Sequence, residues 1–182
     1  MFKKFKSEAF VAIAAIVISV CALFVSFYEA RIMRTQQKAS VWPYVQISQE
    51  YNHERFALNA LNRGVGPAMI ESVILTLDGK PQENLHTLLN NVLGKGHGLG
   101  YSNTKVSGIN NQVLSKDYDK FMISMNWDEA GKVREFTENF NRIGYEVVYS
   151  SILGDCWVLT NENDPEPCDC PGDKKLKTQF QF

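Results

Sequence analysis

The chain has 182 residues and a formal net charge of −1, from 19 Lys and Arg against 20 Asp and Glu. The 144 residues from Ala39 onward carry 13 Lys and Arg against 18 Asp and Glu, a net charge of −5. An excess of negative charge disfavours binding to the phosphates of nucleic acids, so we expect no nucleic-acid partner. That length is usual for one domain with its own core, and no linker or internal repeat divides it.

A short basic N-terminal tail, residues 1–8, precedes a long uncharged run. Residues 9–28 contain no charged side chain, and eleven of these twenty residues are Leu, Ile, Val or Phe. A helix of that length spans about 30 Å, the thickness of the hydrocarbon core of a bilayer. A cleaved signal peptide is the alternative, but its apolar region is usually about 7–15 residues long. We therefore predict a retained transmembrane helix over 9–28 that contacts the lipid bilayer.

The basic residues that flank this segment do not decide its orientation. Three lysines precede it, and Arg31, Arg34 and Lys38 follow it, so the positive-inside rule gives a tie. A charged N-terminal tail is costly to translocate, and the cysteine pattern suits an oxidising compartment. We expect a single-pass protein of the cell inner (plasma) membrane with its domain on the extracytoplasmic side. Small residues in the segment leave a homo-oligomer open.

The elements after the membrane segment favour a mainly-β domain. The helix is predicted to continue over 29–40 as a juxtamembrane helix. Alternating patterns predict strands at 41–47, 56–61, 69–77, 121–127, 145–150 and 157–159, with weak strand character over 102–114. Apolar spacing predicts one helix over 85–92, ended by Gly94, and another over 128–141, with Asp128 as N-cap and Val133, Phe136 and Phe140 on one face.

Short strands separated by turns, with only two helices, favour an antiparallel β-sandwich over a doubly wound α/β fold. The predicted domain covers residues 41–160 and contains the two short helices as insertions. The basic and then aromatic stretch 174–182 suits a docking peptide or an added strand. The default prediction for residues 161–182 is a flexible C-terminal tail.

Residues 62–67 read as a turn between two strands. Gly64 and Gly66 are available for positive φ angles, and Pro67 follows them. We expect the side chain of Asn62 to bond neighbouring backbone groups, as turn asparagines do, and ligand binding by Asn62 is the alternative.

Three of the four cysteines cluster near the C-terminus, while Cys21 lies in the membrane segment. A polar stretch with the composition of a loop separates Cys156 from Cys168 and Cys170. A disulfide from Cys156 to either partner would stabilise the fold by roughly 3 kcal/mol in an oxidising compartment. A metal site of three thiolates is the alternative, although the Cys-x-Cys spacing is tight for structural zinc.

No catalytic signature stands out, and we predict no enzyme activity and no cofactor. The glycine-rich run 94–100 departs from a phosphate-binding loop, because Lys95 is followed by glycine and the glycines follow a helix. The three histidines are far from the cysteines in sequence, and no pattern pairs them with a nucleophile.

Three stretches together resemble a group of uncharacterised bacterial single-pass membrane-anchored proteins. They are the basic helix end and Ser-Val-x-Pro step over 34–43, the Asn-x-Gly-x-Gly-Pro-Ala turn within 58–70, and the Tyr-rich strand and turn over 144–157. The resemblance implies an immunoglobulin-like domain behind one membrane helix, and it supplies no activity. We therefore expect a non-enzymatic protein that presents a β-sandwich to a protein partner. The alternative is a metal- or redox-responsive protein that uses Cys156, Cys168 and Cys170.

Overall fold

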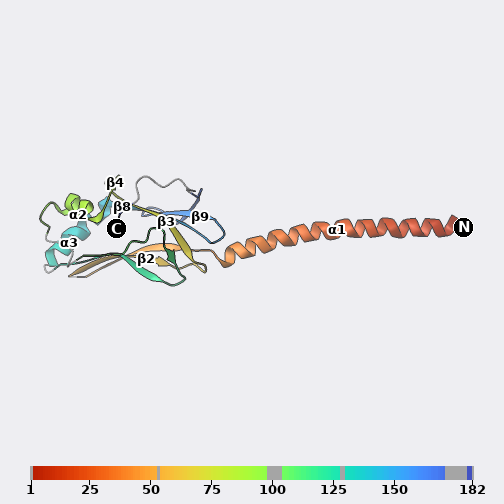
Figure 1. Ribbon diagram of the computed structural model, residues 1–182, viewed down its shortest axis with the longest axis horizontal. Coiled ribbons are helices and arrows are strands. Elements are labelled where there is room, and N and C mark those ends of the chain that lie inside the picture. Colours follow the sequence, from red (N-terminus) through yellow and green to blue (C-terminus); the bar gives the residue numbers. More distant parts are fainter. Residues whose placement is uncertain (1, 53, 98–103, 128–129, 171–179, 182) are drawn as a thin grey trace. The chain divides into compact units, whose positions relative to one another are not determined.

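The computed structural model describes residues 2–52, 54–97, 104–127, 130–170 and 180–181, with side chains of the helices described from Glu8 and from Arg134. The chain divides into two compact units, residues 1–40 and residues 41–182. An N-terminal apolar helix followed by a mainly-β domain with antiparallel sheets is confirmed (Figure 1).

The first unit is one uninterrupted helix, α1, which runs from Phe2 to Ser40. Its stretch Glu8–Ser40 is long and apolar enough to cross a membrane. The large apolar side chains along it are exposed on every side, from Phe10 to Met33. The hydroxyls of Ser19 and Ser26 donate to carbonyls one turn earlier, at 2.8 and 3.0 Å, which satisfies them without water. The helix thus presents no unpaired side-chain hydroxyl at these two positions to a lipid environment.

The second unit contains two antiparallel sheets (Figure 1). One has the order β1-β2-β7-β5 and the other β10-β9-β8-β3-β4, with β6 paired to β3. The strands of the first sheet are β1 Val45–Tyr51, β2 Arg55–Asn62, β5 Thr104–Val106 and β7 Asp119–Asn126. Those of the second are β3 Ala68–Leu77, β4 Lys80–Gln82, β6 Val113–Leu114, β8 Ile143–Ser150, β9 Cys156–Thr160 and β10 Glu166–Cys168.

The buried side chains of both sheets belong to one apolar core. Phe56 of β2 is buried in this core, with ring centroids 4.9 Å from Phe136 and 5.2 Å from Phe140. Phe136 comes from α3, Ala130–Asn139, and Phe140 from the short 3₁₀-helix η1, Phe140–Arg142. The expected N-cap Asp128 lies outside the described residues, as does the side chain of Val133.

The other helix, α2, spans Leu85–Leu93 and buries Leu85, Leu88 and Leu89 in the core. Asn84 caps its first turn, because its Oδ1 accepts a 2.9 Å hydrogen bond from the backbone N–H of Thr87. Gly94 ends it with φ of 79°. Helices α2 and α3 lie side by side at one end of the domain (Figure 1).

One predicted boundary was wrong and one short strand was missed, both for local reasons. The strand predicted at 41–47 begins only at Val45, because the preceding residues form a connection bonded to the turn after β2. Pro81 lies in β4, a short strand that was not predicted. Asp78 and Gly79, with φ of 50° and 76°, form the two-residue loop of a β3–β4 hairpin, in which Leu77 pairs with Lys80.

The described parts of the C-terminal region belong to the domain, which corrects the flexible tail predicted for residues 161–182. β10 pairs with β9, so the second sheet continues beyond residue 160. Phe180 is fully buried, and its backbone N–H donates to the carbonyl of Val73 in β3 at 2.9 Å. Most of the basic stretch 174–182 lies outside the described residues. A buried aromatic ring and a backbone pairing explain why residues 180 and 181 belong to the domain.

Candidate functional site

The Asn62 side chain is completely buried and fully hydrogen-bonded. Its Oδ1 accepts from the backbone N–H groups of Tyr44 and Gly64, at 3.2 and 3.0 Å. Its Nδ2 donates to the carbonyls of Gly66 and Leu114, at 2.8 and 2.9 Å. These four bonds join three parts of the domain: residues 41–44 before β1, called the entry segment below, the turn itself, and β6. In this structure all hydrogen bonds of the Asn62 amide therefore go to the backbone, and neither the oxygen nor the nitrogen is available to a ligand.

Gly64 and Gly66 are required for a reason different from the predicted one. Neither has a positive φ, so the expectation that they supply left-handed backbone was wrong. A Cβ atom at Gly64 would lie 2.3 Å from the backbone nitrogen of Tyr44, and one at Gly66 would lie 2.1 Å from the carbonyl oxygen of Val41. The entry segment passes directly over the turn, and only glycine leaves room for it.

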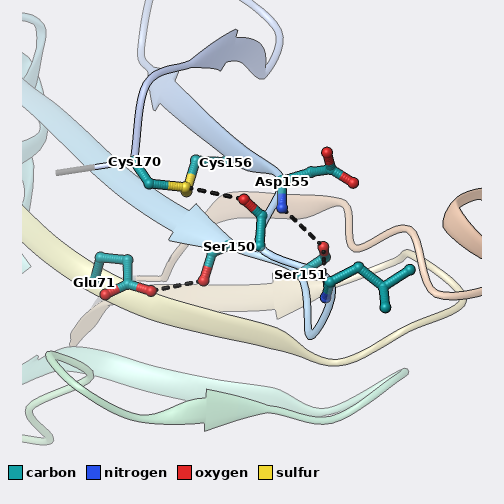
Figure 2. The surroundings of a disulfide bond; sticks show 8 residues. Glu71, Ser150, Ser151, Asp155, Cys156 and Cys170 are labelled. Atoms are coloured by element: carbon teal, nitrogen blue, oxygen red, sulfur yellow. Dashed lines mark hydrogen bonds between the residues drawn. A yellow bond between two sulfur atoms is a disulfide. The ribbon is translucent and has the colours of Figure 1, made fainter. Parts of the chain in front are cut away.

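The cysteine cluster forms one disulfide, between Cys156 at the start of β9 and Cys170 just after β10 (Figure 2). The two Cα atoms are 5.3 Å apart, a usual spacing for a disulfide. Beside it, the hydroxyl of Ser150 donates to a carboxylate oxygen of Glu71 at 2.6 Å (Figure 2). The disulfide fixes the chain after β10 to the second sheet.

Cys168 is a partly buried free thiol, and it pairs directly with Cys156 across β10 and β9. Burial raises the pKa of the Cys168 thiol, and the carboxylates of Asp169 and Glu146 raise it further. In the described part of the chain, no group of three or more His, Cys, Asp or Glu side chains is placed to hold a metal ion. With two of the three thiolates joined, the three-thiolate site is not formed in this structure.

Only the first part of the glycine-rich run, residues 94–97, is described. The ring of His97 is mostly buried and packs 6.4 Å from the ring of His86 on α2. This contact places two of the three histidines on the helical end of the domain, whereas the Cys156–Cys170 disulfide joins the start of β9 to the chain after β10.

An open groove of about 700 Å³ lies in the β domain. One wall is the segment 44–49 at the start of β1, and the other is the segment 160–165 between β9 and β10. Leu61, Tyr145 and Leu159 contribute apolar surface between the walls. The hydroxyl of Tyr44 donates to Asp164 at 3.2 Å, which ties the two walls together at one point.

Charged groups of both signs line the groove. They are Arg63 from the turn after β2, and Glu162 and Asp164 from the β9–β10 connection. Two carboxylates and one guanidinium give these lining residues a net negative charge, as the domain as a whole has. The sequence prediction missed this groove, because nothing in the sequence shows that the strand predicted at 41–47 and the loop predicted at 161–167 lie close together.

No family model, curated protein or solved structure matched this chain. Its function is therefore inferred from its own sequence and geometry.

Proposed function

We propose that this protein is anchored by one transmembrane helix and presents an immunoglobulin-like β-sandwich to a protein partner, without catalysing a reaction. The observation that carries the proposal is the open groove bordered by β1, in a domain that follows a helix long enough to span a membrane. Exposed grooves of this size with mixed polar and apolar walls suit recognition of another chain. The proposal includes membership of the bacterial membrane-anchored group that the sequence resembles.

A photo-reactive amino acid at Gln46, which is exposed and lines the groove, tests the contact in intact cells. The matched control is the same residue at Lys116, which is exposed and does not line it. We expect a discrete protein adduct from position 46 and none from position 116. If neither position gives an adduct and the protein is monomeric and alone in mild detergent, the contact function is wrong.

We also propose that the domain lies on the extracytoplasmic side of the inner membrane. The Cys156–Cys170 disulfide supports this, because such bonds persist in oxidising compartments. A membrane-impermeant maleimide should label Cys168 in intact cells, and two further cysteines only after reduction. Cys168→Ser is the control that removes the first signal. Labelling that needs lysed cells would place the domain in the cytoplasm.

A redox-responsive function ranks second, and one observation favours it. Cys168 lies directly opposite Cys156 in the β10–β9 register, and attack of its thiolate on Sγ of Cys156 would form a Cys156–Cys168 bond and release the Cys170 thiolate. The raised pKa of Cys168 opposes this step at neutral pH, because only the thiolate is nucleophilic. Peptide mapping of the disulfides in an oxidised and a glutathione-buffered sample tests it, with Cys168→Ser as control. A single pairing in both samples would remove this function.

A further inference from the structure

We infer that β1 accepts an extended, basic segment of another protein as an added β-strand along the groove. This inference rests on the proposed protein-contact function and specifies where and how the partner binds.

The hydrogen-bond pattern of β1 leaves every second residue without main-chain bonds to β2. The N–H of Arg63 donates to the carbonyl of Tyr44 at 2.8 Å, so this directly opposed pair is a hydrogen-bonded one. Directly opposed pairs in an antiparallel ladder alternate between bonded and non-bonded. In the observed register, Ile47 and Gln49 belong to non-bonded pairs, opposite Ala60 and Leu58. Their N–H and C=O groups therefore point away from β2, and both residues line the groove.

The other edge strands in the described residues are short, and their sequences discourage pairing. β4, β5 and β10 have three residues each, and β6 has two. Pro81 lies within β4, Pro167 within β10 and Lys105 within β5. Proline, lysine and short length are the usual means of preventing a strand from joining an exposed edge.

β1 has none of these protections. It is seven residues long, contains no Pro, Lys or Arg, and carries a single charge, at Glu50 near its end. Within the described part of the chain, β2 is its one strand partner. A long edge with so little charge that borders a groove is a template for β-strand addition, in which main-chain hydrogen bonds give affinity.

The groove also favours one class of added strand. Its far wall carries Glu162 and Asp164, opposed by Arg63 alone, and the domain has a net charge of −5. Pairing the β1 edges of two copies would bring both acidic walls and two acidic domains together, which like-charge repulsion disfavours. A partner segment with Lys or Arg places opposite charges along this wall. Every second side chain of that segment would face Tyr145 and Leu159, so alternating basic and apolar residues fit best.

Two synthetic peptides test the inference on the full chain in detergent micelles. Each peptide is seven residues long, the length of β1. One alternates Lys with Val, and the other alternates Glu with Val. Titration with a fluorophore-labelled peptide gives the dissociation constant. We expect the Lys peptide to bind at least about tenfold more tightly than the Glu peptide, and the difference to shrink as salt is added.

Gln49→Pro tests the backbone contact. The N–H of Gln49 points away from β2, so proline removes a donor to the added strand but no bond of the ladder. We expect Gln49→Pro to weaken Lys-peptide binding about tenfold, because one main-chain acceptor of the peptide loses its donor. Gln49→Ala is the matched control and should bind the Lys peptide like the unchanged protein. Gln49→Pro and Gln49→Ala should unfold at the same denaturant concentration.

The double variant Glu162→Gln and Asp164→Asn tests the charge independently of the backbone, and it should remove most of the preference for the Lys peptide. Equal binding of the two peptides, or full binding by Gln49→Pro, would overturn strand addition of a basic segment. If adducts still form from position 46 in cells, the protein-contact function would survive that result. A dimer that Gln49→Pro dissociates would instead assign the β1 edge to a second copy of this chain.

Discussion

Replacing Asn62 is the most direct test of how the turn after β2 holds the entry segment in place. Asn62→Ala removes four hydrogen bonds at 2.8–3.2 Å and leaves two backbone N–H groups and two carbonyls without that partner. At about 1 kcal/mol of net stability for each bond, the expected loss is about 4 kcal/mol. A domain of this size is stable by about 5–15 kcal/mol, so the loss is a large fraction of the total.

The assay is urea unfolding of the full chain in detergent, followed by tryptophan fluorescence. Asn62→Asp is the informative companion, because its carboxylate still accepts from Tyr44 and Gly64 but faces the carbonyls of Gly66 and Leu114 without a proton to donate. We expect it to be at least as destabilising as alanine at pH 7. Its stability should recover as the pH falls and the carboxyl group becomes protonated, since this environment favours the neutral form. A loss below about 1 kcal/mol for Asn62→Ala would refute the reasoning.

Three further predictions concern the core, the disulfide and a buried phenol. Phe180→Ala should lower the free energy of unfolding by about 3–5 kcal/mol, because Phe180 is fully buried, while Gln181→Ala, at an exposed side chain, should change it little in the same urea assay. Reducing the Cys156–Cys170 bond, which closes a sequence separation of 14, should cost about 3 kcal/mol, and an unchanged midpoint with reductant would contradict this. Burial raises the pKa of Tyr149 from 10.0 to about 12, so the folded state disfavours the phenolate. Stability is therefore full below pH 10 and should fall by up to about 2.7 kcal/mol as the pH rises to about 12. Tyr149→Phe should abolish this decline and change stability little at pH 7, since the hydroxyl makes no hydrogen bond of standard geometry with the described residues.

Local sequence patterns were sufficient where the physics is local. The uncharged run 9–28 predicts a membrane-spanning helix from length and hydropathy alone, and the structure extends it as one helix to Ser40. The apolar spacing over 85–92 predicts α2 because side chains three and four residues apart share a helix face. Alternation over 145–150 likewise predicts the position of β8.

Some local signals were present but were outweighed by others. Asp78-Gly79 is a strong hairpin signal, yet no strand was predicted after it, where β4 with Pro81 pairs back on β3. Residues 161–167 were assigned to a loop because they are polar, yet the last two belong to β10, Glu166–Cys168, since an edge strand tolerates proline.

The sequence alone determined that this protein has an apolar helix long enough for a membrane and a domain rich in antiparallel strands. It could not determine which cysteine pairs with Cys156, why Gly64 and Gly66 are glycines, or that Phe180 completes the core. It also could not show that β1 is the long edge strand bordering a groove. Each of these depends on contacts between residues far apart in the chain, such as Asn62 with Leu114 or Phe180 with Val73. Periodicity and propensity describe a segment and its immediate neighbours, whereas strand order and edge position are fixed only when the whole domain packs.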